Sequence, residues 1–243
     1  MKQIHSLLIS LALLVSGSAM AQWTQPPTGG PDSRIERIQA KAESLYERGS
    51  YKRAHFIYSN ELARKGDKYA QYMTGYMYLM GHGVVEDPVI ASAWYRIAAE
   101  RQAPEFIAVR DQVLQTLDDE KRVRSDELYV HLRREYSDLA IVMEMLVKDL
   151  ENLSRARTGS RLSSNASSVV IVDPKTGMQM SADHLRNREL RIVQTRLDFV
   201  TTRLDIDSIK AERAGQHIDG LWERIEDFLS VVDDEANGLY AAP

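Results

Sequence analysis

The sequence contains no cysteine among its 243 residues. Disulfide bonds, thiolate metal sites, cysteine nucleophiles and a lipid-modified N-terminal cysteine are therefore excluded. Positive charge is not in excess either, because 31 Lys and Arg residues stand against 35 Asp and Glu residues, which gives a formal net charge of -4. General binding of nucleic acid or of an anionic membrane surface needs a basic surface, so this charge balance argues against both.

Recognisable motifs for catalysis, for metal ions and for nucleotides are also missing from the sequence. The six histidines include no pair at the His-x-x-x-His spacing of a zinc metalloprotease helix. His82 lies between two glycines but lacks the third glycine and the preceding strand of a dinucleotide-binding fingerprint, so it is expected to be an exposed loop residue. The sequence therefore predicts no enzymatic activity, no cofactor and no bound metal.

Long apolar runs are confined to the N-terminus. Lys2 precedes an almost wholly apolar stretch from Ile4 to Val15, and Ala19-Met20-Ala21 has the small-x-small pattern of a signal-peptidase site. The apolar stretch is shorter than the ~20 residues that a membrane span needs. Residues 1–21 are thus predicted to be a signal peptide cleaved after Ala21, which places the mature chain in a bacterial periplasm without a membrane span. Full secretion remains the alternative.

Residues 22–32 are rich in proline and glycine and are predicted to be a flexible linker. The following region, residues 33–117, has apolar residues at helical spacing and predicts a series of short helices. Two pairs of segments within it match one another at different offsets. They are Tyr46–Gly49 with Tyr78–Gly81, 32 residues apart, and Ala54–Tyr58 with Ala91–Tyr95, 37 residues apart. One helix hairpin therefore occurs twice, with connectors of different length.

The second of these hairpins has small residues, aromatic residues and one aspartate at characteristic positions. These residues are Ala70, Gly75, Tyr78, Gly81, Gly83, Asp87, Ala91, Trp94, Tyr95, Ala98 and Ala99. In these positions residues 68–102 resemble one full unit of the Sel-one-like repeat, a relative of the tetratricopeptide repeat. Residues 34–66 resemble a degenerate unit of the same kind. The resemblance implies a short α-solenoid of helix hairpins in which these residues form the scaffold and not an active site.

The chain departs from the repeat pattern at three positions. Thr74 stands where the family prefers leucine, and Pro88 follows the loop aspartate, which is unusual for the family. Gln102 replaces the usual glycine after the alanine pair. The lost glycine suggests that the repetition ends after this unit.

Four residues at helical spacing form a stripe within the second hairpin. They are Tyr69, Met73, Tyr76 and Met80. In the family pattern these positions are variable, so the stripe is a candidate surface for a protein partner, since tyrosine is a favoured interface anchor and methionine adapts to varied shapes. The alternative is that the stripe packs against neighbouring helices, because two repeats leave little groove to spare.

The C-terminal half predicts long helices and one small β-hairpin. A long helix is expected over 118–157, with a heptad seam of Leu139, Met143, Leu146, Leu150 and Leu153. A serine-rich linker (158–168), a β-hairpin (169–180) and a helical hairpin (181–243) are expected to follow. These helices predict a bundle or a coiled coil, formed either within one chain or as a homo-dimer.

The sequence favours a non-enzymatic adaptor that holds a protein or peptide partner in the cell envelope. A self-associating structural coiled-coil protein is the first alternative, and a protein that binds or modifies the cell wall is the second.

Overall fold

The computed structural model describes residues 33–158, 170–172, 177, 179–181, 188 and 191–196. This part of the chain is almost entirely helical, which confirms the all-α fold class. The chain divides into two compact units, Met1–Ile141 and Val142–Pro243. Four predicted segments lie wholly or mostly outside the described residues. They are the signal peptide, the linker over 22–32, the serine-rich linker and the C-terminal helical hairpin.

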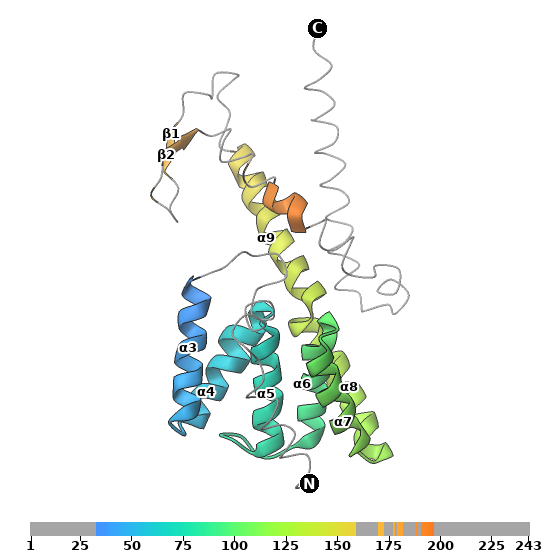
Figure 1. Cartoon of the computed structure of the whole chain (residues 1–243). Coiled ribbons are helices and arrows are strands. Elements are labelled where there is room, and N and C mark those ends of the chain that lie inside the picture. The colour runs from blue at the N-terminus through green and yellow to red at the C-terminus, as the bar shows by residue number, and fades with distance from the viewer. Residues whose placement is uncertain are drawn as a thin grey trace. The chain divides into compact units, whose positions relative to one another are not determined.

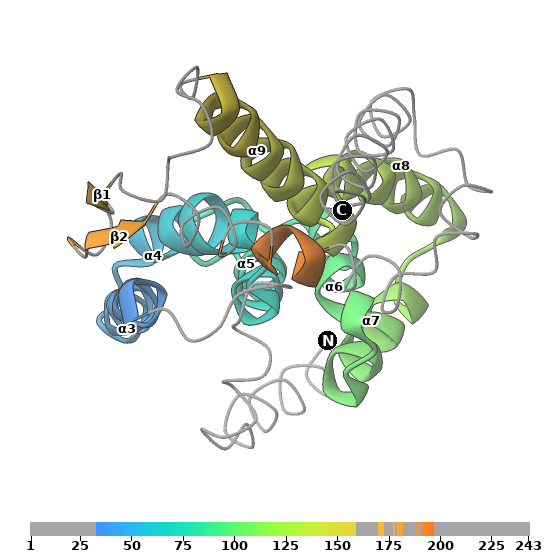
Figure 2. The same cartoon turned by 90° about the horizontal axis from the view of Figure 1, so that it is seen from above.

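The first unit is a succession of helices in two layers. In chain order these are α3 (Ser33–Glu47), α4 (Tyr51–Phe56), the π-helical turn η1 (Ile57–Leu62), the 3-10 turn η2 (Ala63–Lys65), α5 (Lys68–Met80), α6 (Pro88–Ala98), the 3-10 turn η3 (Ala99–Arg101), α7 (Pro104–Gln115) and α8 (Asp119–Tyr136) (Figure 1). Seen from above, α3, α5 and α7 lie in one row and α4, α6 and α8 in a second row (Figure 2). Helical pairing therefore continues beyond Gln102, because α6 contacts both α7 and α8.

Three of the helices begin at an aspartate whose side chain accepts a hydrogen bond from the first turn. Asp67 Oδ1 accepts from the Ala70 amide at 2.9 Å at the start of α5. Asp87 caps α6 and Asp118 caps α8 in the same way. These bonds satisfy amide groups that a helix start leaves without an intrahelical acceptor, so each start is fixed locally.

The π-helical turn accounts for one residue more between Ala54 and Ala63 than between the corresponding alanines of the α6 region. Eight residues separate Ala54 from Ala63, whereas seven separate the corresponding Ala91 from Ala99 in α6. All four alanines are buried, so both helices must present them to the same core. A π-turn accommodates a single inserted residue without moving the faces of the helix on either side.

Two side chains satisfy carbonyl groups near this turn. Ser59 Oγ donates to the carbonyl of His55 at 2.8 Å, and Asn60 Nδ2 donates to the carbonyl of Phe56 at 3.3 Å. These bonds supplement the altered main-chain ladder and reduce the cost of the insertion.

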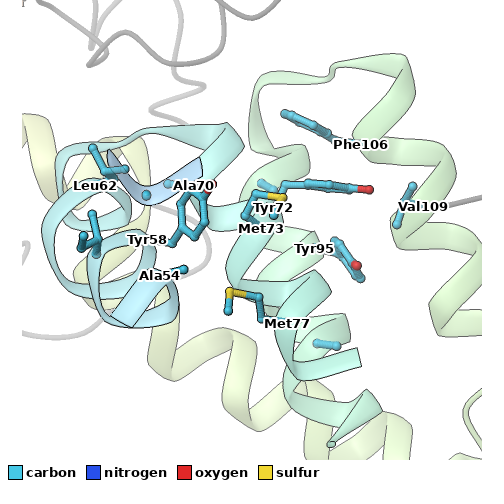
Figure 3. Packing of buried hydrophobic residues seen from close by; sticks show 14 of the residues in the cluster. Ala54, Tyr58, Leu62, Ala70, Tyr72, Met73, Met77, Tyr95, Phe106 and Val109 are labelled. Carbon is cyan, nitrogen blue, oxygen red and sulfur yellow. The ribbon is translucent and has the colours of Figure 1, made fainter. Parts of the chain in front are cut away.

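The main core lies between the two layers from α3 to α7. Figure 3 shows the side chains that meet there, among them Tyr58, Tyr72, Met73, Tyr95 and Phe106. A Cβ atom added at Gly75 would lie 3.2 Å from both the Ala91 carbonyl oxygen and Trp94 Cβ, so glycine lets α5 approach α6 closely. The alanines at 70, 91, 98 and 99 are buried as well.

A second buried cluster joins α6 to α8. Trp94 and Tyr136 meet edge to face with ring centroids 4.7 Å apart, and Ile97 and Ala63 complete the cluster. Ser92 and Ser125 are both buried, and their hydroxyl groups share a hydrogen bond of 2.7 Å. These contacts pack α8 on α6.

The long helix expected over 118–157 is divided at Ser137. This residue has an extended backbone, with ψ of 152°, and α9 (Asp138–Thr158) begins directly after it. Ser137 Oγ accepts a hydrogen bond from the Ala140 amide at 3.1 Å, which is a serine N-cap. The single helix was a wrong prediction, because a heptad pattern does not reveal a capped break between two helices.

The described residues of the second unit include two short strands. Val170–Val172 (β1) pairs antiparallel with Gln179–Ser181 (β2), with Ile171 opposite Met180. Most of the intervening residues lie outside the described part, so the β-hairpin itself stays a prediction. Within residues 33–158 and the shorter described segments, no helix is long and apolar enough to cross a membrane.

Candidate partner-binding surface

The predicted stripe on α5 is divided between the core and the surface. Met73 is only 7% exposed and belongs to the main core. Tyr69 and Tyr76 pack against that core but remain half-buried, and Met80 at the helix end is also half-buried. Three of the four residues therefore keep part of their surface accessible to a partner.

Four aromatic side chains from different elements gather around one end of this stripe. We call them the aromatic cluster: Tyr46, Tyr51, Tyr76 and His82. The rings of Tyr51 and His82 are stacked, with centroids 4.4 Å apart and planes inclined by 10°. Tyr46 lies edge-on to Tyr76 at 6.3 Å. All four side chains are half-buried, so the cluster forms a continuous aromatic patch across α3, α4, α5 and the loop after α5.

A glycine turn places His82 in this cluster. Gly81 and Gly83 have positive φ angles of 65° and 79°. A Cβ atom at Gly83 would lie 2.6 Å from the Lys52 amide nitrogen and from the carbonyl carbon of Tyr51. Only glycine therefore lets the loop rest on the start of α4, and this contact brings the imidazole over the Tyr51 ring. His82 is thus partly buried, and the expectation of an exposed loop residue was wrong.

Two members of the aromatic cluster make a polar contact. Tyr46 Oη and His82 Nδ1 lie 2.8 Å apart. Burial, reinforced by Tyr76, raises the pKa of Tyr46 above its ordinary value, and burial lowers the pKa of His82. The phenol of Tyr46 and the imidazole of His82 therefore share one hydrogen bond. Such a patch offers apolar ring faces together with polar edges.

Deeper tyrosines under the stripe have unpaired hydroxyl groups. In the part of the chain that the structure describes, the buried hydroxyls of Tyr58, Tyr72 and Tyr95 have no hydrogen-bond partner. Burial raises the pKa of each of these three phenols. Tyr72 stacks on Phe106 at 5.4 Å, so these rings contribute mainly apolar packing.

A buried ionic cluster lies at the other end of α5, and the sequence analysis did not predict it. We call it the ionic cluster: Lys68, Glu100, Arg101 and Asp138. The ammonium of the fully buried Lys68 lies 2.7 Å from Glu100 Oε2 and 3.1 Å from Asp138 Oδ1. Arg101 binds Asp138 through Nε at 2.8 Å and Nη2 at 3.1 Å.

The ionic cluster is balanced and internally satisfied. Burial alone would raise the pKa of Asp138, but Lys68 and Arg101 outweigh it and hold that pKa below its ordinary value. Glu100 also accepts from the Asp138 amide at 2.9 Å, at the first turn of α9. Two cations thus face two anions, and the cluster acts as a structural joint between α5, η3 and the start of α9. The partners are far apart in the sequence, so no local pattern indicated it.

The described residues hold no group of three or more His, Asp or Glu side chains placed to bind a metal ion. In comparisons with known proteins, no family model, no curated protein and no solved structure matches the chain.

Proposed function

We propose that this chain is a non-enzymatic adaptor of the bacterial periplasm, which holds a protein or peptide partner on the face formed by α3 and α5. One observation carries the proposal: the aromatic cluster and the neighbouring Tyr69 and Met80 form a half-buried patch contributed by several elements. Tyrosine anchors supply large contact areas with few rotatable bonds, so such a patch binds a partner at low entropic cost.

The proposed architecture is a short α-solenoid of the Sel-one-like type. Its support is the succession of helix hairpins in two layers and the close glycine contact between α5 and α6. In this proposal α3, α5 and α7 line the binding side, and the repeat residues hold the helices in place. The export signal and the periplasmic location are part of the same proposal and rest on the N-terminal sequence alone.

Site-specific photo-crosslinking tests the proposed function. A photo-reactive residue replaces Tyr76 in the full chain, cells are irradiated, and the adducts are identified by mass spectrometry. We expect one dominant adduct to another envelope protein. The matched control carries the same residue at Glu127, an exposed position on α8, and should not give that adduct.

Two crosslinking outcomes would contradict the proposal. Adducts confined to the same chain, or to a second copy of it, would show that the patch is a packing surface. The same adduct from position 127 would show that capture is not specific to the α3–α5 face.

A further inference from the structure

The two exposed flanks of α3 carry opposite charges. Between them runs the buried face of the helix, formed by Ile35, Ala42 and Leu45. One flank is basic: Arg34, Arg37, Lys41 and Arg48. The other is acidic: Glu36, Glu43 and Glu47. Residues three, four or seven positions apart share a helix face, so each set forms a continuous stripe.

The acidic flank faces α5 and the candidate surface. Gln39 Nε2, one turn before Glu43, donates to Asp67 Oδ2 at 2.7 Å at the start of α5. Tyr46, one turn after Glu43, contacts the Tyr76 ring further along α5. Glu43 therefore lies between two points of contact with α5, and it is half-buried.

Within the part of the chain that the structure describes, the carboxylates of Glu43 and Glu47 lack a counter-ion. Within the described residues, neither forms a salt bridge or a side-chain hydrogen bond. The basic flank does not supply one, since the guanidinium groups of Arg37 and Arg48 donate to carbonyls of α3 itself. Burial and the like charge of Glu47 raise the pKa of Glu43, which is the electrostatic cost of leaving it unpaired.

A buried hydroxyl without a partner belongs to Tyr58, whose ring contacts Tyr69. Tyr58 is 1% exposed and its ring lies edge-on to Tyr69 at 6.4 Å. Its hydroxyl has no hydrogen-bond partner in the described part of the chain. The pKa of this phenol is raised by burial and then by Tyr69, Glu43 and Asp67. A buried hydroxyl without a partner is unfavourable, so this region holds an unsatisfied polar group beneath the half-buried Tyr69.

We infer that the partner presents a cationic side chain, arginine or lysine, to a site formed by Glu43, Glu47 and Tyr69. The inference rests on the proposed function and specifies the chemistry of its partner. A guanidinium or ammonium group would pair with the unsatisfied carboxylates and lie against tyrosine rings, whose faces attract cations. The neighbouring aromatic cluster then receives the apolar part of the same partner.

A peptide titration tests this cation site directly. The chain from Gln22 to Pro243, without the predicted signal peptide and labelled with ¹⁵N, is titrated with a blocked peptide of alternating glycine and arginine. The matched probe is the same peptide with citrulline, the uncharged analogue of arginine. We expect the arginine peptide to shift amide resonances over residues 43–47 and 69–76, and the citrulline peptide to leave them unchanged. Equal shifts with both peptides, or shifts confined to other helices, would overturn the inference.

A double variant, Glu43→Gln with Glu47→Gln, is the matched test on the protein side. It should weaken binding of the arginine peptide by roughly tenfold, because it removes both carboxylates that would pair with the cation. Glu127→Gln, which removes an exposed carboxylate of α8, should bind like the original chain. The double variant should melt at an equal or higher temperature, because it removes an unpaired half-buried charge. Unchanged peptide binding by a folded double variant would contradict the cation site.

Crosslinking at position 76 separates failure of this inference from failure of the proposed function. A specific adduct that forms equally well in the double variant would leave the adaptor in place and exclude a cationic contact at Glu43. Absence of any adduct from the original chain would contradict the adaptor itself. Loss of the adduct only in the double variant supports both.

Discussion

Gln102 occupies a backbone position that normally suits glycine. Its φ angle is 59°, and it follows η3 as Gly66, with φ of 79°, follows η2. Glycine would suit this position better, because a side chain in the left-handed region costs about 1–2 kcal/mol. The turn tolerates glutamine, and the chain continues into α7 at this cost.

Replacing Gln102 with glycine should stabilise the protein. The side chain is exposed, so little packing is lost, and relief of the backbone strain should exceed the extra entropy of glycine in the unfolded chain. We expect the free energy of unfolding in urea to rise by about 0.5–1 kcal/mol. Gln102→Ala keeps the strained Cβ and should give no gain. An equal gain from alanine would mean that backbone strain is not the cause.

Asp67 makes the stability of the first unit depend on pH. It is 1% exposed, and burial raises its pKa to about 7, although the Ala70 amide, Gln39 and Arg101 act in the opposite direction. The unfolded carboxyl titrates near pH 4. Between about pH 4 and pH 7 the folded chain holds a proton that the unfolded chain has released, so stability should fall as the pH rises through this range.

The variant Asp67→Asn tests this dependence. Asparagine is as good an N-cap as aspartate and carries no charge, so it should keep the bond to the Ala70 amide. We expect the variant to be more stable than the original chain at pH 8 and to lose the decline between pH 5 and pH 8 in denaturant titrations. Asp138 does not contribute to this decline. Its pKa is lowered, so the stability that its charged form gives the protein is lost only at more acidic pH. A decline that persists in the variant would assign it to another group.

At the scale of single elements, the π-helical turn makes the first hairpin one residue longer than the second. Asn60 is exposed and lies within the turn, so its deletion should convert η1 into regular α-helix while Ala54 and Ala63 stay in the core. We expect a folded protein whose unfolding free energy changes by no more than about 1 kcal/mol. Circular dichroism and urea unfolding provide the measurement.

Deletion of Arg96 from α6 is the matched control for that experiment. No π-turn exists there, so the deletion rotates Ala98 and Ala99 by about 100° relative to Ala91. Buried small residues then leave the core, and we expect loss of cooperative unfolding. If both deletions were equally harmful, the extra residue would not be the origin of the π-turn.

Local features of these elements were predictable from the sequence and long-range ones were not. Asp67, Asp87 and Asp118 mark helix starts because each side chain binds amides within its own first turn. The ionic cluster joins residues seventy positions apart, Lys68 and Asp138, so its pairing depends on the packing of whole helices. The stripe on α5 shows the same limit: its spacing was predicted, but only packing decides that Met73 is buried while Tyr69 and Tyr76 stay partly accessible.

At the scale of the whole molecule, α8 ends the layered array of the first unit with a polar outer surface. Its inner side contributes Ser125 and Tyr136 to the packing on α6. Its other side carries mostly charged residues, and Val123 and Val130 are exposed singly among them. The four rings of the aromatic cluster lie instead on α3, α4, α5 and the loop after α5.

In the second unit, α9 contacts the helical segment 191–196. Arg196 forms a salt bridge with Asp149 of α9 and donates to the carbonyl of Met145 at 3.4 Å. Val193, on the same helical turn, is buried. These contacts join α9 to the segment 191–196.

Charge reversal of this pair distinguishes packing of the C-terminal helices within one chain from packing between two chains. Asp149→Arg or Arg196→Asp alone places like charges together and should destabilise the second unit by about 1 kcal/mol or more, whereas the double reversal should restore stability. Light scattering should give a monomer mass for the original chain and for the double variant. If the contact instead joined two chains, mixing the two single variants would restore stability and yield dimers. Restoration only when both changes lie in one chain would establish that α9 and the segment 191–196 pack together intramolecularly.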